Sequence, residues 1–463
     1  MVFSSLSFIL IFLPCVLFIY YFVPRKYRKI RNLVLLLFSL LFYFIGEQKL
    51  VLLMLLSCLV NYLITRLMNN RNKKVLLIIS IIFNLGMLGY FKYADFFIDN
   101  FNKLLLTNIN LLKIVLPIGI SFYTFQTMSY VIDVYKGKLL AEKSLIDFSL
   151  FVTFFPQLIA GPIVRFIEIQ KEIKVRTESI GLFHDGVQRF IIGLSKKVLI
   201  SNVIAEVVSF YPTMNYHTTL FAWLVAIMIP LQIYFDFSGY SDMAIGLGKM
   251  FGFNFPENFK FPFASSSVTE FWRRWHITLG TWFRDYVYIP LGGNKVIFVK
   301  HIINILIVWT LTGLWHGASW NFVIWGVYYG LLLTLEKYIY GNFLKTHIVI
   351  SHIYLILATI IGFEIFNSTN LNELVLNISE LFGRNVVGFT SILTNYNIKS
   401  YFIILVIAVI GSTPVIKNIL SKLKEKNNIL INITGDIICI VLLILSIAYL
   451  VDGSYNPFLY FRF

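Results

Sequence analysis

Two histidines, each directly after a tryptophan, are the residues of this sequence best suited to chemistry. His276 lies in FWRRWHITLG and His316 lies in GLWHGASWNF. The surrounding chain is 58% hydrophobic, and an ionisable group at membrane depth is costly unless it faces a cavity or a partner. A histidine can take a proton from a hydroxyl and return it to a leaving group, which acyl transfer to an alcohol requires. The alternative is a structural histidine that bonds to a neighbouring helix.

Three arginines accompany the first histidine. Arg273 and Arg274 precede His276, and Arg284 follows in TWFRDY. Guanidinium groups bind phosphates, such as those of coenzyme A, and they also pair with carboxylates or anchor a helix at the membrane interface. If the arginines bind a phosphorylated substrate, His276 would orient that substrate or share the proton transfer with His316.

Glycine and tryptophan residues surround the second histidine. Trp315 supplies an apolar wall beside His316, and Gly313 and Gly317 permit close approach of another helix or of a ligand. This setting favours a functional histidine over a structural one.

Polar side chains also interrupt two other apolar runs. The run IPLQIYFDFSGYSDMAIGLG contains Asp236 and Asp242, and TFFPQLIAGPIVR contains Gln157. All three are candidate substrate-binding residues. For the two aspartates, an ion pair with Arg273, Arg274 or Arg284 is the favoured interpretation, because unpaired charges at this depth are costly.

The elements that must position these residues are membrane helices. Charged residues make up only 13% of the 463 residues, and roughly eleven apolar runs approach the ~20 residues that a helix needs to cross a bilayer. The runs are continuous and do not alternate, so an all-α polytopic membrane protein with re-entrant segments is predicted, and a β-barrel is not. Three isolated cysteines in these runs indicate neither a metal site nor a disulfide framework.

Basic residues concentrate between the apolar runs. The net charge is +16, but the distribution follows the positive-inside rule, so we expect contact with the lipid bilayer and no nucleic acid. The first run carries no preceding positive charge and is followed by PRKYRKIR, which places the N-terminus outside. We expect one domain over residues 1–463, with scaffold helices at 1–90, a catalytic core at 116–340 and C-terminal helices at 341–463. Two prolines and a glycine within 155–162 predict a re-entrant turn or kinked helix there.

Several blocks together resemble a known family. They are PIGISFYTFQTMSYVIDVYKGK, FFPQLIAGPIVR, QIYFDFSGYSDMAIGLGKMFGF, FWRRWHITLGTWFRDYVYIPLGGN, GLWHGASWNFVIWG and the terminal PFLYFRF. The chain is similar throughout to the membrane-bound O-acyltransferase family, and within it to the bacterial alginate O-acetylation branch.

This resemblance implies a helical fold around a central funnel or tunnel in a bacterial plasma membrane. In this resemblance, His316 corresponds to the family's principal motif histidine and His276 to its second motif histidine. The resemblance further implies acetyl-CoA as the cytoplasmic acyl donor, with no bound cofactor. It also implies two partners: an extracytoplasmic SGNH-like protein, which passes the acetyl group to a polysaccharide, and the polysaccharide synthesis machinery.

Two other functions stay open at this point. A related branch transfers D-alanine from a carrier-protein thioester to teichoic acid. A transporter would also show broken apolar segments and buried aspartates, although the sequence has no visible internal repeat.

Overall fold

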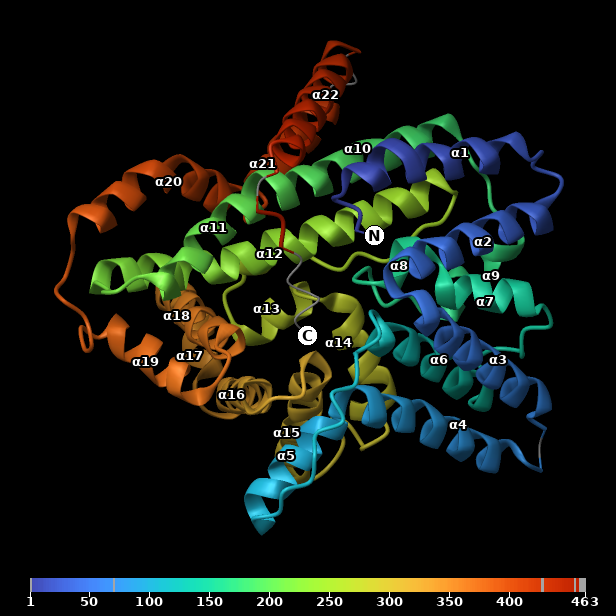
Figure 1. Ribbon diagram of the computed structural model, residues 1–463, viewed down its shortest axis with the longest axis horizontal. Helices are drawn as coiled ribbons and strands as arrows, with labels where there is room; N and C mark the ends of the chain where they lie inside the picture. The colour runs from blue at the N-terminus through green and yellow to red at the C-terminus, as the bar shows by residue number, and fades with distance from the viewer. Residues whose placement is uncertain (1, 70, 426–428, 454, 458–463) are drawn as a thin grey trace. The chain divides into compact units, whose positions relative to one another are not determined.

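The computed structural model describes residues 2–69, 71–425, 429–453 and 455–457, and every regular element in these ranges is a helix (Figure 1). The all-α prediction is therefore confirmed. Most of the PFLYFRF block that supported the family resemblance lies outside the described residues.

Eight described helical segments are long and apolar enough to cross a membrane, which confirms a polytopic membrane protein. The number is smaller than the predicted eleven partly because Arg28–Leu67 counts as one continuous helical segment of 40 residues. Its backbone breaks at Gln48, where φ is 42°, so it contains two separate helices. The apolar helix Phe8–Phe22 falls short of the required length.

The chain forms two compact units, and α10 (Ile180–Ser195) and α12 (Thr219–Met250) each run from one unit into the other. The first unit contains Met1–Phe190 and Met243–Pro256. Its other helices are α1 (Leu13–Phe22), α2 (Arg28–Glu47), α3 (Val51–Leu67), α4 (Lys73–Leu88), α5 (Ala94–Leu105), α6 (Ile120–Tyr135), α7 (Leu145–Thr153), α8 (Phe155–Leu158) and α9 (Phe166–Lys174). The predicted division into scaffold, core and C-terminal helices stays a prediction.

Phenylalanine rings fill the core of the first unit. The ring of Phe155 lies 5.4 Å from that of Phe12 and 5.7 Å from that of Phe42. Phe155 begins α8, a single helical turn that follows the end of α7 at Thr153. The chain then turns and continues without regular structure to α9. The predicted break in the helix is therefore confirmed, and the re-entrant course of this segment stays a prediction.

The second unit contains Ile191–Asp242 and Glu257–Phe463. Its other helices are α11 (Asn202–Phe210), α13 (Val268–Arg274), α14 (Ile277–Phe283), α15 (Phe298–His316), α16 (Trp320–Leu335), α17 (Gly341–Thr346), α18 (Ile348–Asn367), α19 (Leu371–Leu381), α20 (Ile392–Gly411), α21 (Val415–Glu425) and α22 (Ile429–Val451). Short π-helical and 3-10 turns extend several of these helices in both units.

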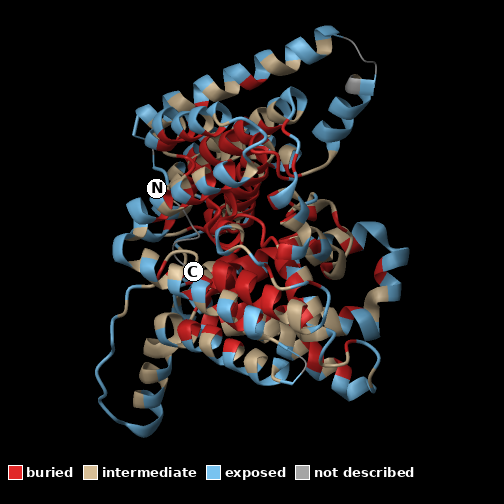
Figure 2. Ribbon diagram, turned by 90° about the vertical axis from the view of Figure 1, so that its right-hand side faces the viewer, coloured by how far each residue is buried: buried red, intermediate tan, exposed pale blue. Residues whose placement is uncertain are grey.

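An aromatic core joins the helices of the second unit. The ring of Trp272 on α13 lies 5.3 Å from Trp325 and 4.7 Å from Tyr329, both on α16. Trp275 lies 5.1 Å from Phe363 on α18. Figure 2 shows exposed residues along the outer faces of many helices, and large apolar side chains are common among them. An extensive exposed apolar surface is what lipid-facing helices require.

Candidate functional site

A cavity of about 1020 Å³ lies within the second unit, between residues 266 and 345 of the chain. His276 and His316 both line it, so the structure brings the two predicted histidines to one space. Four cationic side chains also line the cavity: Arg273, Arg284, Lys337 and Lys345.

One face of α15 forms a long wall of this cavity. Its lining residues recur at helical spacing: His301, Ile305, Val308, Trp309, Thr312 and His316. At 1.5 Å per residue, the first and last of these lie about 22 Å apart along the helix axis. The cavity is therefore elongated, with His316 at one end of the wall and His301 at the other.

The corner between α13 and α14 holds His276 in an unusual conformation. Its φ of 44° is left-handed, which non-glycine residues adopt rarely and at a conformational cost. Neighbouring backbone hydrogen bonds fix the corner: Ile277 N–H donates to the Asn258 carbonyl, and Lys260 N–H donates to the Arg274 carbonyl, at 3.0 and 2.9 Å. A strained backbone held by its surroundings is typical of a functional position.

Asn258 also determines which nitrogen of His276 carries the proton. Its Oδ1 accepts hydrogen bonds from Thr278 N and Oγ1 at 3.3 and 3.0 Å, and it lies 3.1 Å from His276 Nδ1. Because this oxygen acts as an acceptor, Nδ1 donates to it, and Nε2 becomes the acceptor nitrogen of the neutral ring.

His276 lies outside the eight candidate spans and is 3% exposed. Burial, with a smaller contribution from the nearby His316, holds the pKa of His276 well below its usual value. The ring is therefore neutral at physiological pH and able to accept or relay a proton.

Aromatic rings enclose His316 at the C-terminal end of α15. Its imidazole lies 5.2 Å from the ring of Trp325 and 5.1 Å from that of Phe366. Trp315 lies between the two histidines, with ring centroids 5.8 Å from His276 and 5.1 Å from His316. These walls restrict water at the histidines, as an acyl-transfer site requires.

Glycines allow α15 and α16 to approach closely along this wall (Figure 1). A Cβ at Gly313 would lie 2.1 Å from the Phe322 carbonyl oxygen, and a Cβ at Gly326 would lie 2.3 Å from the Trp309 carbonyl oxygen. The ring of Phe322 also covers Gly317. The prediction that Gly313 and Gly317 permit close approach is confirmed for a neighbouring helix.

The predicted arginines differ in their environment. Arg274 pairs with Glu270 on the same helix at 2.5 Å and is not among the residues that line the cavity. Arg273 is exposed and lines the cavity, and it has no ion-pair partner within the described part of the chain. Of the two, Arg273 is therefore the one available to an anionic ligand.

The carboxylate of Glu336 caps the helix that carries these arginines. Its two oxygens accept hydrogen bonds from the backbone N–H groups of Val268 and Thr269 at 2.8 and 3.1 Å. A carboxylate is favourable at a helix N-terminus because it satisfies free N–H groups and complements the helix dipole. The end of α16 thus fixes α13 beside the cavity.

The predicted pairing of the two aspartates with the arginines is wrong. Asp236 pairs with Lys197 at 2.6 Å, and Asp242 pairs with Lys196 at 2.7 Å. The reason is geometric, because α12 presents these carboxylates to the π-helical turn Lys196–Ser201 that follows α10. Neither aspartate is among the residues that line the cavity.

Gln157 lies in the first unit, on α8, where it is fully buried. Its Nε2 donates to the Phe151 carbonyl oxygen. It is not among the cavity-lining residues of the second unit, and its predicted role in substrate binding stays a prediction.

A third histidine of the cavity was not identified from the sequence. His301 is buried, with Nε2 2.7 Å from the Tyr288 hydroxyl and Nδ1 2.5 Å from the Tyr338 hydroxyl. Lys337 Nζ lies 3.5 Å from the same Nε2. An ammonium group can only donate, so it favours the tautomer in which Nε2 accepts and Nδ1 donates to Tyr338. The sequence signal that could have identified His301 is its 15-residue separation from His316. This is about four helical turns, which places both histidines on the same face of one helix.

Comparison with known proteins shows what the chain is similar to. Residues 138–376 match the model of MBOAT, the membrane-bound O-acyltransferase family. The probable alginate O-acetylase AlgI of Pseudomonas aeruginosa is 43% identical over 381 residues, which cover 80% of this chain and 73% of that protein. The AlgI of Pseudomonas putida is 37% identical over the full length of both chains. A peptidoglycan O-acetyltransferase of Helicobacter pylori is 36% identical over 407 residues, which cover 79% of this chain and 76% of that protein.

Proposed function

Because the chain belongs to the membrane-bound O-acyltransferase family, we propose that it transfers an acetyl group from a cytoplasmic thioester to a hydroxyl group of an extracytoplasmic polysaccharide or partner protein. The relatives are named for O-acetylation of alginate or of peptidoglycan, which supports acetate as the acyl group. The observation that carries the proposal is that His276 and His316 line the same cavity.

In the proposed reaction, His316 is the general base. It removes the proton from the acceptor hydroxyl as the hydroxyl oxygen attacks the thioester carbonyl carbon. The carbon–sulfur bond then breaks, the acetyl group stays on the acceptor oxygen, and the proton passes to the leaving thiolate. His276, fixed by Asn258 in its Nε2-acceptor tautomer, would position the acceptor or share the proton transfer.

We propose acetyl-CoA as the donor. Its phosphates would bind the cationic side chains that line the cavity, all four of which belong to exposed residues. Guanidinium groups bind phosphate oxygens in bidentate geometry. Lys337 lies beside His301, at the end of the α15 wall opposite His316, so phosphates bound there would lie away from the histidine that acts on the thioester.

Charge distribution and family resemblance support a proposal for the side of the membrane from which each substrate binds. Basic residues in the loop after the first apolar helix favour a cytoplasmic location for that loop and an external N-terminus. The acetyl acceptor would then be reached from outside, through an SGNH-like partner of the polysaccharide synthesis machinery.

The test is release of free coenzyme A from acetyl-CoA by the purified full-length protein in nanodiscs, supplied with an acceptor polysaccharide. His316→Ala should reduce release at least 100-fold, the lower range for a lost general base. His347→Gln is the matched control, because His347 is exposed and does not line the cavity. Full release by a well-folded His316→Ala protein would contradict the assignment.

Two further measurements on the same nanodisc preparation separate the two alternatives. Turnover of a D-alanyl carrier-protein thioester, with none of acetyl-CoA, would indicate the D-alanyl transfer of the related branch. Binding of an acetylated substrate without consumption of either thioester would favour a transporter.

A further inference from the structure

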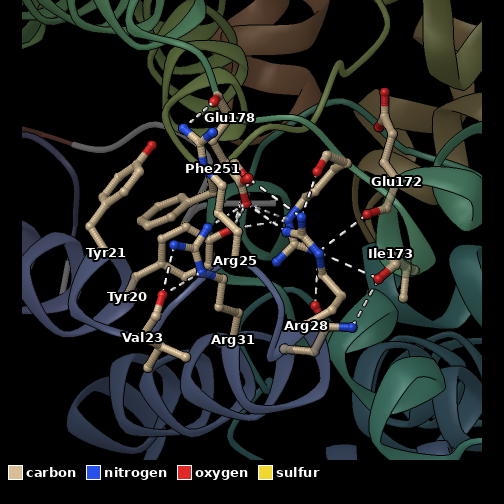
Figure 3. Close-up of polar contacts among 12 residues, drawn as sticks. Tyr20, Tyr21, Val23, Arg25, Arg28, Arg31, Glu172, Ile173, Glu178 and Phe251 are labelled. Carbon is tan, nitrogen blue, oxygen red and sulfur yellow. Dashed lines mark hydrogen bonds and ion pairs between the residues drawn. The ribbon is translucent and has the colours of Figure 1, made fainter.

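Four arginines surround one glutamate in the first unit, far in sequence from the histidines. Arg25, Arg28 and Arg31 come from the start of α2 and the loop before it, and Arg176 lies two residues before Glu178. Figure 3 shows the side chains of Arg25, Arg28 and Arg31 gathered around Glu178. Cationic groups gathered this closely repel one another, so the cluster requires more negative charge than an ordinary surface ion pair provides.

Oε1 of Glu178 makes most of the side-chain contacts in this cluster. Arg28 Nη1 donates to it at 2.5 Å, and the Tyr20 hydroxyl donates to it at 2.6 Å. Arg31 Nη1 lies 2.9 Å away and Arg176 Nε 3.7 Å away. Arg25 Nη2 donates to the backbone carbonyl of Glu178 at 2.7 Å. The carboxylate of Glu178 therefore faces three guanidinium groups, and the backbone carbonyl of Glu178 accepts from the fourth.

Two of these cations are buried. The side chains of Arg31 and Arg176 are 3% and 0% exposed. Their guanidinium carbons lie 4.8 and 5.6 Å from the centre of the Tyr20 ring, and Arg176 also lies 4.5 Å from the Phe253 ring. Within the described part of the chain, Arg176 Nη2 is buried without a hydrogen-bond partner.

Nearby carboxylates do not balance this charge. Asp147 reaches the cluster only through Asn32, which donates to Asp147 and accepts from Arg176, both at 2.8 Å. The carboxylate of Glu172 accepts hydrogen bonds from Asn254. Removing charges from water is costly unless opposite charge compensates them. Four cations and one directly contacting carboxylate leave a local excess of positive charge.

The cluster is open to solvent on one side. Arg25 is exposed, and so are the adjacent Lys26 and Lys29. The loop that carries Arg25 and Lys26 lies between the apolar helix Phe8–Phe22 and the candidate span that begins at Arg28. Basic groups directly beside a membrane helix are favourably placed for the headgroups of anionic lipids.

We propose that this arginine cluster, entered at Arg25, binds a phosphate group. Guanidinium groups match phosphate oxygens in geometry and charge, and the bound anion would compensate the excess charge around Glu178. An anionic phospholipid and a soluble phosphate both present this group. The proposal concerns the first unit alone and does not depend on acyl transfer.

The test measures the melting temperature of the purified, delipidated full-length protein in a nonionic detergent. Three ligands are added separately: short-chain phosphatidylglycerol, phosphatidylcholine with the same acyl chains, and inorganic phosphate. The variants are Arg25→Gln and Lys26→Gln, which change exposed side chains. Arg71→Gln removes an exposed positive charge from a different loop and is the matched control.

We expect phosphatidylglycerol or inorganic phosphate to raise Tm by about 2 °C or more at saturation. This rise should be retained in Arg71→Gln and should fall by more than half in Arg25→Gln. A rise with phosphatidylglycerol alone identifies a lipid headgroup as the source, and a rise with inorganic phosphate identifies a soluble anion. Equal rises in Arg25→Gln and wild type, equal effects of the two lipids in every variant, or no rise at all would overturn the proposal.

Discussion

The ring of His276 and the side-chain amide of Asn258 lie 3.1 Å apart, from Nδ1 to Oδ1. This contact links a left-handed corner between two short helices to a segment 18 residues earlier in the chain. It fixes both the orientation of the imidazole and the nitrogen that carries its proton. Asn258 is thus a positioning residue for the proposed reaction, although it is not among the residues that line the cavity.

Asn258→Ala should lower the rate of acetyl transfer about 10-fold to 100-fold. This is the loss seen when a metal-binding histidine loses the hydrogen-bond partner that orients its ring. The variant leaves the His276 N–H without its acceptor and frees the ring to rotate. Asn258→Asp keeps an acceptor oxygen at the same place and should recover much of the rate. The measurement is the initial rate of coenzyme A release and its pH profile; an unchanged rate and profile in the alanine variant would contradict this role.

His301→Phe should weaken donor binding without slowing the chemical step. The change removes the hydrogen bonds that hold Tyr288 and Tyr338 in place. Both tyrosines line the cavity, so the shape of this end of the cavity should change. His301 lies about 22 Å from His316 along α15, too far to act on the thioester. We therefore expect KM for acetyl-CoA to rise about tenfold, with kcat changed less than threefold.

Steady-state kinetics over a range of acetyl-CoA concentrations measure both quantities. His347→Gln, a histidine outside the cavity, is again the control and should change neither. A large fall in kcat at constant KM would instead place His301 in the chemical step.

The sequence identified the two histidines because each is a rare ionisable residue in an apolar segment. The same argument applies to His301, but no tryptophan or second motif marks it, and only the helical spacing from His316 connects them. Asn258 lies in a loop, NFPENFK, whose contacts depend on the tertiary fold. The partners of Asp236 were predicted incorrectly for a similar reason. The sequence offers many basic residues, and only the packing of α12 against the turn after α10 selects Lys197.

The helical class was predictable from composition, since long continuous apolar runs permit few other folds. The number of helices was harder to predict. A break such as the one at Gln48 depends on a local backbone conformation that hydropathy does not report.

Lys197→Met should destabilise the protein by about 3 kcal/mol, because it leaves the buried carboxylate of Asp236 without its lysine. Lys196→Met is the matched control. Its pair with Asp242 is partly exposed, and loss of such a pair costs up to about 1 kcal/mol. Thermal unfolding in detergent compares the two variants, and equal losses would show that burial does not determine the strength of these pairs.

Gly313→Ala should destabilise the α15–α16 contact by about 1–3 kcal/mol, the range for an overpacked core. The added methyl group would meet the Phe322 carbonyl oxygen at 2.1 Å, and backbone cannot move aside as a flexible side chain can. Gly86→Ala on α4 is the control, because no atom lies within 4 Å of its new Cβ. Comparable melting temperatures for the two variants would contradict the close packing at Gly313.

Acid should destabilise the protein through Glu178. Burial alone would raise the pKa of this carboxyl, but the hydrogen bonds from Arg28 and Tyr20 outweigh it and lower the pKa from 4.5 to about 2. The folded-state pKa is therefore below the unfolded one. The stabilisation is fully present above pH 4.5 and is lost as pH falls from there towards 2.

The measurement is Tm between pH 7 and 3 for wild type and Glu178→Gln. The glutamine cannot lose a proton, so the variant should have a lower Tm at pH 7 and a flatter dependence below pH 4.5. Each unit of the pKa difference corresponds to about 1.4 kcal/mol of stability in wild type. Parallel curves for the two proteins would mean that the charge on Glu178 does not stabilise the fold. Another negative charge would then have to neutralise the surrounding arginines.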